Sequence, residues 1–170
     1  MREFTFGSAQ SGTGGLTVAN RAIVSLNMLQ PAAAPNVNIE FLRHWIGQAA
    51  NATSAQQRVS LQTQAAAQPT NALAVTPRSL KLSDPNASVI AGSTTIAAGK
   101  CGVNIGTEGA GSLTAWWEDD FNVLNGFLKV LTPAETEIIP AGYTSAATFQ
   151  FVNAAATLTT WSWGQNYREV

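Results

Sequence analysis

The stretch FNVLNGFLKVLTPAETEIIP, residues 121–140, decides the fold class of this chain. In its first half, apolar residues occupy both alternating sets of positions, which is typical of a β-strand covered on both faces. The sequence therefore predicts a central strand that continues through a bulge at Asn125-Gly126. Because Asn and Gly both tolerate positive φ, a hairpin of two short strands is the alternative. Residues 132–135 and 140–142 then bound a second extended segment, and no helix is expected.

Short runs with alternating apolar and polar residues recur through the rest of the chain, separated by turn signals. The clearest is PNVNIEFLRHWIG, residues 35–47, which places Phe41 and Trp45 on one face and Glu40 and His44 on the other. About eight such strands predict an all-β fold, an antiparallel β-sandwich of the jelly-roll kind. The first and last strands of that layout share a sheet, which would place residues 21–29 near residues 159–167.

Residues 1–20 differ in composition from the remainder of the chain. A short extended piece with Phe4 and Phe6 leads into a Gly/Ser/Thr-rich segment at residues 7–15, which has no apolar pattern that could order it. We therefore predict a flexible N-terminal arm and linker over residues 1–20, and a single β-sandwich domain over residues 21–170. The alternative is that this tail is loose or folds onto its own domain.

Charge is scarce in this protein. Only 11% of residues are charged, with a net charge of −1, whereas average domains carry about a quarter. A surface this neutral is more easily explained if neighbouring proteins cover much of it. The basic residues are spread singly and form no stripe for nucleic acid, and the uncharged residues 138–167 include too much Pro, Gly, Asn and Gln for a bilayer span. We expect protein or sugar partners, with no nucleic acid and no membrane.

No catalytic constellation stands out, and we predict a protein that is not an enzyme. His44 is the single histidine, and its strand pattern predicts an exposed or interface position instead of a catalytic role. Cys101 is the single cysteine, which excludes an internal disulfide and predicts a small buried residue or a loop thiol. Neither a metal site nor a cofactor is expected.

The acidic cluster Trp116-Trp117-Glu118-Asp119-Asp120 is the candidate site for a small ligand. An indole offers a flat apolar surface to a sugar ring, and carboxylates accept hydrogen bonds from sugar hydroxyls, so Trp116, Trp117, Asp119 and Asp120 form a candidate sugar platform. An ion site with further oxygen ligands is a second interpretation. The structural alternative is that one tryptophan packs in the core and the acids begin the following strand.

Aromatic residues lie at both ends of this charge-poor, Ala/Thr/Ser/Asn-rich chain: Phe4 and Phe6 at the start, and Trp161, Trp163 and Tyr167 at the finish. In this composition and in its aromatic chain ends, the whole chain resembles virion structural proteins of tailed bacteriophages. It is most similar to the small jelly-roll cement or decoration proteins of the head. The resemblance rests on no diagnostic motif.

This resemblance implies a non-enzymatic subunit on the capsid surface, made in the host cytoplasm without a signal peptide. Its partners would be the major capsid protein and neighbouring copies of itself, with a homotrimer favoured. The aromatic residues of the two chain ends are the expected partner-binding residues. No apolar signal region follows Arg2 and Glu3, in keeping with this expectation.

The alternative function is a carbohydrate-binding β-sandwich, such as the head of a phage fibre or a lectin-like receptor-binding module. It would use Trp116 and Trp117, or Trp161 and Trp163, as the platform for a sugar ring. Trp161 and Trp163 lie two residues apart on one face of a predicted strand. That spacing suits sugar stacking, core packing and a protein interface alike.

Overall fold

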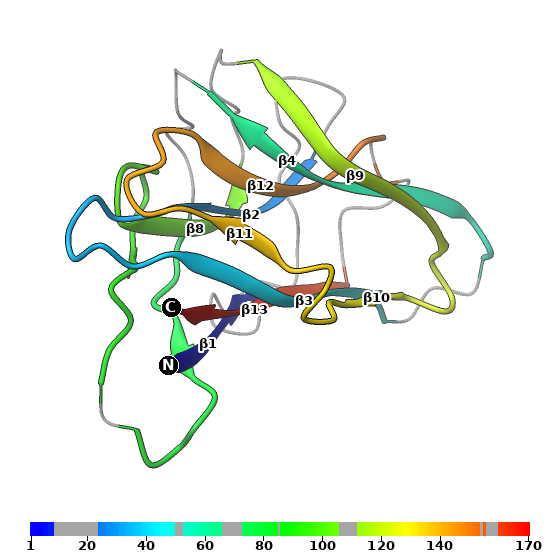
Figure 1. Ribbon diagram of the computed structural model, residues 1–170. Helices are drawn as coiled ribbons and strands as arrows, with labels where there is room; N and C mark the ends of the chain where they lie inside the picture. The colour runs from blue at the N-terminus through cyan, green and yellow to red at the C-terminus, as the bar shows by residue number, and fades with distance from the viewer. Residues whose placement is uncertain are drawn as a thin grey trace.

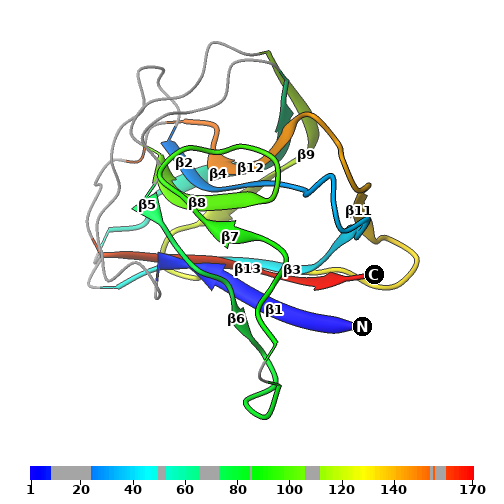
Figure 2. The ribbon, with the colours of Figure 1, turned by 90° about the vertical axis from the view of Figure 1, so that its left-hand side faces the viewer.

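The computed structural model describes residues 1–8, 24–49, 53–65, 73–84, 86–105, 112–153, 155 and 160–170. Within these residues the protein is all-β, and its two sheets pack face to face as a sandwich (Figure 1). A view turned by 90° shows the same two layers, with both chain ends side by side on one sheet (Figure 2). The predicted fold class is confirmed.

One sheet has six strands and the other has seven. The six-stranded sheet runs in the order β10 (Phe127–Val130), β3 (Ile39–Gln48), β13 (Trp161–Glu169), β1 (Arg2–Gly7) and β6 (Arg78–Ser79), and β11 (Glu137–Ile139) also pairs with β3. The seven-stranded sheet runs in the order β5 (Leu73–Ala74), β8 (Lys100–Ile105), β2 (Val24–Gln30), β12 (Ala146–Phe151), β4 (Gln56–Gln64) and β9 (Leu113–Asn122), and β7 (Ala91–Gly92) adds a short parallel pair to β8.

Four antiparallel pairs define the topology: β1 with β13, β2 with β12, β3 with β10, and β4 with β9. When β11 and the inserted β5 to β8 are set aside, eight strands remain, and they pair first with eighth, second with seventh, third with sixth and fourth with fifth. This is the pairing of a long hairpin rolled into two sheets, which is a jelly roll. The remaining five strands lie in the connections.

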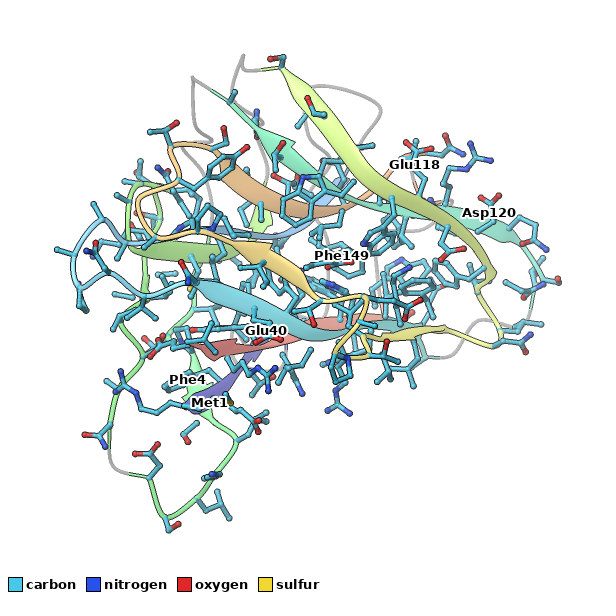
Figure 3. All side chains as sticks on the ribbon, viewed as in Figure 1. Met1, Phe4, Glu40, Glu118, Asp120 and Phe149 are labelled. Carbon is cyan, nitrogen blue, oxygen red and sulfur yellow. The ribbon has the colours of Figure 1, made fainter. Side chains whose placement is uncertain are left out.

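The core lies between the two sheets and is rich in aromatic side chains. Phe149 of β12 points into it from the upper layer of Figure 3. The largest fully buried side chains come from both sheets: Trp163, Tyr167, Phe4, Phe6, Phe41, Phe149, Phe151, Leu26, Met28, Leu29, Ile39 and Leu61. Burying so much aromatic surface provides the main driving force for folding.

The N-terminal residues 2–7 belong to the sandwich, so the predicted arm is wrong for this part of the chain. They form β1, which lies between β13 and β6 and pairs with β13 over its whole length. Phe4 and Phe6 have no exposed surface, and Phe4 lies 5.6 Å from the ring of Tyr167. The alternative that the tail folds onto its own domain holds for these residues, whereas residues 9–20 lie outside the described part of the chain.

The segment of residues 21–29 was predicted to share a sheet with residues 159–167, and this is wrong. Among the described residues, β2 and β13 lie in opposite sheets and face each other across the core. Trp163 Nε1 joins them by donating to the backbone oxygen of Leu26 at 3.1 Å and to Asn27 Oδ1 at 2.8 Å. The first and last strands do share a sheet, but the first strand is β1.

Residues 121–131 do not form one central strand. β9 ends at Asn122 and β10 begins at Phe127, and the two strands belong to different sheets, so the chain crosses from one layer to the other between them. Gly126, with φ of 69°, lies in this crossing, where a Cβ would come within 3.0 Å of the Ile46 backbone oxygen. Neither the continuous strand nor the paired hairpin is correct, although the pair Asn125-Gly126 does mark a turn.

The two alternating sets of apolar residues in the segment 121–131 have different environments. The reason is that β10 is an edge strand with one covered face. Phe121 and Val123 are buried and Phe127 packs against the core. Leu128 and Val130 point away from the core and are 63% and 61% exposed. The prediction of a strand covered on both faces is therefore wrong, and the second set forms a surface.

A β-bulge in β3 reverses the predicted positions of His44 and Trp45. Asn166 pairs with Arg43 and Tyr167 pairs with Phe41, so Leu42 is an extra residue. The insertion shifts the alternation by one position. His44 therefore points into the core with no exposed surface, and Trp45 points outward, contrary to the sequence pattern.

Candidate functional site

A pocket of about 310 Å³ opens where the edge strands of the two sheets meet. Trp116 and Trp117 of β9 form one side. The opposite side consists of residues of β10, of β11 and of the turn between them: Lys129, Val130, Leu131, Glu135 and Glu137. The site thus brings together chain segments that belong to different sheets, which are held in place by the core beneath them.

Glu137 connects the pocket to the core. Its carboxylate accepts a hydrogen bond from Trp117 Nε1, and its Oε2 lies 2.7 Å from His44 Nε2. His44 Nδ1 in turn lies 2.8 Å from the amide nitrogen of Gln165. Both ring nitrogens of His44 therefore have a polar partner. His44 has no exposed surface, and its contact with Glu137 ties that carboxylate to the core.

Trp117 separates the core from the pocket. Its ring stacks on Phe127 at a centroid distance of 5.9 Å and contacts His44 and Phe149 at 5.5 and 6.2 Å. Lys129 Nζ lies 4.6 Å from the Trp117 ring centroid, in cation–π geometry, and 3.8 Å from Asp119 Oδ2. The indole is therefore held in one orientation by core rings, by a carboxylate and by an ammonium group.

Glu135 is positioned by a tight turn. Its backbone nitrogen donates to the Thr132 oxygen at 2.9 Å, and its Oε2 accepts from Thr132 Oγ1 at 3.0 Å. Thr136 Oγ1 also donates to the Pro133 oxygen at 3.0 Å. The segment that was predicted only as an interruption between strands thus presents a carboxylate to the pocket.

The structure divides the predicted sugar platform. Trp116 and Trp117 line the pocket. Asp119 is not part of the lining, but it forms an ion pair with Lys129, which is. Trp116 is the extra residue of a bulge, since Leu61 pairs with Trp117 and Gln62 pairs with Ala115, and it is 38% exposed. The structural alternative holds only in part. Trp117 is half-buried and packs against the core, but the acids lie within β9 and do not begin a following strand.

Asp120 is not part of this site. It lies with Glu118 on the other face of β9, where both point away from the core (Figure 3). Arg58 Nε donates to Asp120 Oδ1 at 2.9 Å, and this hydrogen bonding lowers the pKa of Asp120 below its ordinary value. Successive side chains of a strand point to opposite faces. Asp119 and Asp120 are therefore adjacent in the sequence but lie on different faces of β9.

The five aromatic residues expected to bind a partner are instead part of the core. Trp161 is 3% exposed and the others have no exposed surface, namely Phe4, Phe6, Trp163 and Tyr167. Trp161 lies 4.9 Å from the Phe151 ring, and the Tyr167 hydroxyl lies 2.6 Å from Ser88 Oγ. These aromatic side chains pack between the two sheets.

A different apolar surface lies on the outer face of the six-stranded sheet. Leu128 of β10 pairs with Trp45, and Ile138 of β11 pairs with Glu40, so these side chains share one face. Leu128, Val130 and Ile138 are 63%, 61% and 51% exposed. We call these three residues together with Trp45 the docking face.

Trp45 lies against the sheet because its neighbour across β13 is a glycine. A Cβ on Gly164 would be 2.5 Å from Trp45 Cζ2, so any larger residue would displace the indole. Beside it, Arg168 forms an ion pair with Glu40, and hydrogen bonding from that guanidinium lowers the pKa of Glu40. The docking face is thus a half-buried indole with exposed aliphatic residues, bordered by paired charges.

The residues missed by the sequence analysis are Lys129, Glu135 and Glu137 in the pocket and Trp45, Leu128, Val130 and Ile138 on the docking face. Two signals were available in the sequence. Glu135 and Glu137 are spaced two apart, so two carboxylates lie close together along the chain at the start of a predicted extended segment. The second signal is the apolar pair Leu128 and Val130, which would lie on an exposed face if residues 127–130 formed an edge strand.

Cys101 is a free cysteine buried in the core. It has no exposed surface, its Sγ lies 3.2 Å from the Val75 backbone oxygen, and burial raises the pKa of its thiol to about 12. The thiolate is the reactive form. We therefore expect no reaction with a thiol reagent such as dithionitrobenzoate in buffer at pH 8, and one equivalent of reaction in denaturant. Rapid labelling of the native protein would contradict this packing.

In the described part of the chain, no group of three or more His, Cys, Asp and Glu residues is arranged to hold a metal ion. The same residues include no helix long and apolar enough to cross a membrane. Comparison with protein-family models, with curated protein sequences and with solved structures gave no match for this chain.

Proposed function

We propose that the protein is a non-enzymatic structural subunit of a tailed-bacteriophage particle, a cement or decoration protein of the head. It binds the outer surface of the shell and stabilises contacts between major capsid subunits, as a homotrimer on the virion. The observation that carries the proposal is the docking face, because three exposed aliphatic side chains beside an indole are costly to leave in water.

The chemistry of the docking face suits a protein partner. Interface cores are depleted in charge and enriched in aromatic residues, and their rims are polar. Trp45 and Leu128 supply the apolar centre, and the Glu40–Arg168 ion pair supplies part of the rim. With a net charge of −1, the protein meets little electrostatic repulsion when many copies gather on one shell.

Attachment of such a subunit also stabilises the shell to which it binds. A protein that binds the assembled state and not the separated subunits stabilises the assembly by mass action. Exposed neutral side chains such as Thr94, Asn125 and Thr132 are desolvated at lower cost than unpaired charges. A charge-poor sandwich with one apolar face is therefore suited to clamping neighbouring shell subunits.

The test is the copy number of this chain in particles. We expect quantitative mass spectrometry of density-gradient-purified particles from the source to give a ratio to the major shell subunit that is comparable to one. A much lower ratio would contradict the decoration role and favour a fibre or vertex protein. Absence from the particle would refute the proposal.

A pair of matched variants tests the docking face itself. We expect Leu128→Asp to weaken binding to particles that lack this protein by about tenfold or more, because burying an unpaired carboxylate costs at least 1.4 kcal/mol or so. Leu82→Asp is the control, since Leu82 is fully exposed outside the docking face. Co-sedimentation measures both affinities, and equal binding by the two variants would exclude this face as the attachment site.

A further inference from the structure

We propose that the pocket between the sheet edges is a binding site for a neutral sugar, of the size of one or two hexose units. The inference goes beyond the structural role proposed above, because it concerns a small ligand and a pocket that shares only Val130 with the docking face. It rests on the shape of the pocket, on the fixed orientation of its polar groups and on its charge.

The pocket has the dimensions and lining of a ligand site. Its volume of about 310 Å³ is at the lower end of the range for small-molecule pockets, about 300–1,000 Å³. Apolar walls from Trp116, Val130 and Leu131 alternate with the charged groups of Lys129, Glu135 and Glu137. A sugar has the same mixed character, with apolar C–H faces and hydroxyl groups at its edge.

The polar groups are oriented before any ligand arrives. Glu137 is fixed by Trp117 and by the buried His44, and Glu135 is fixed by Thr132. A carboxylate oxygen has two lone pairs, so both side chains retain the capacity to accept from a hydroxyl group. Such preorganisation reduces the entropy that binding must overcome.

The charged groups of the pocket are of both signs, and a neutral polyol can form hydrogen bonds with both kinds. The Lys129 ammonium group already lies over the Trp117 ring, 4.6 Å from its centroid, so a cationic ligand would meet a like charge. An anionic ligand would meet the carboxylates of Glu135 and Glu137. A hydroxyl group both donates and accepts, so one sugar can donate to the carboxylates and accept from the ammonium.

Trp116 provides the exposed stacking surface. It is the extra residue of the β9 bulge and is 38% exposed, whereas Trp117 is held between the core rings and Lys129. A bulge turns a side chain out of the regular alternation and is common beside functional sites. The stacked sugar would therefore contact Trp116 and donate its hydroxyls to Glu135.

The test is titration of the isolated protein with the methyl glycosides of glucose, galactose, mannose and N-acetylglucosamine, followed by calorimetry and by tryptophan fluorescence. We expect at least one glycoside to bind with millimolar affinity. Trp116→Ala and Glu135→Gln should each weaken that binding by about tenfold. Glu118→Gln is the matched control, because Glu118 lies on the opposite face of β9, and it should bind as the unmodified protein does.

Each other outcome overturns the proposal. Binding of none of the four glycosides would refute it, and binding that is unchanged in both pocket variants would place the sugar elsewhere. Binding of tetramethylammonium chloride without any glycoside would make the pocket a cation site. Glu135→Gln keeps the assay decisive if Trp116→Ala fails to fold. Particles are not needed, so this result is independent of the copy-number measurement.

Discussion

Deletion of residues 1–7 is expected to unfold the sandwich, and not merely to release the protein from a partner. The deletion removes β1, which lies between β13 and β6, and with it the fully buried Phe4 and Phe6. Truncating a core Phe to Ala costs about 3–5 kcal/mol, and the total stability of a domain is only about 5–15 kcal/mol. Circular dichroism and size-exclusion chromatography of the truncated protein measure the loss of fold.

Single substitutions test the same strand without removing it. We expect Phe6→Ala to lower the free energy of unfolding by about 3–5 kcal/mol in urea titrations. Leu82→Ala is the control, because Leu82 is fully exposed, and surface changes of this kind stay within about 0.5 kcal/mol. A truncated protein that keeps a native spectrum and midpoint would show that the strand is a dispensable arm after all.

Trp163→Ala is expected to have the second largest effect, a loss of about 3–5 kcal/mol in the free energy of unfolding. Trp163 has no exposed surface, and its Nε1 hydrogen bonds to Leu26 and Asn27 join the two sheets. Trp163→Phe retains most of the ring but removes the donor. It should cost about 1–3 kcal/mol, because the buried acceptors lose their partner.

The matched control for this position is Trp116→Ala, which removes the same side chain from a site that is 38% exposed. Its loss of stability should be much smaller than that of Trp163→Ala, since less buried surface disappears. Urea denaturation followed by circular dichroism gives all three values. If the two alanine variants lose equal stability, the assignment of Trp163 to the core contact between sheets is wrong.

The sequence predicted the β-sandwich because alternation, turn residues and the absence of a helical period are local properties of the chain. The pair Asn125-Gly126 and the Pro140 turn were found correctly for this reason. The bulge in β3 was not predictable, because one extra residue, Leu42, changes the face of His44 and Trp45 without changing composition. A bulge is fixed by pairing with a distant strand, here β13.

The candidate site was predicted in part for a similar reason. Trp116 and Trp117 are adjacent in the sequence, so the sequence alone could predict that both belong to one site. Glu135 and Glu137 come to them from another sheet, across the crossing at Gly126. A segment of this length can return to the same sheet or cross to the opposite one, and its own residues do not distinguish the two paths.

The sequence by itself determined that this chain forms strands, that they make a sandwich, and that few charges cover its surface, because these follow from residue type and spacing. Only the tertiary structure decided which strands are edges. An apolar face is core on an interior strand and surface on an edge strand, so Phe4 and Phe6 are buried while Leu128 and Val130 are exposed. Neighbours in space, and not side-chain chemistry, make that difference.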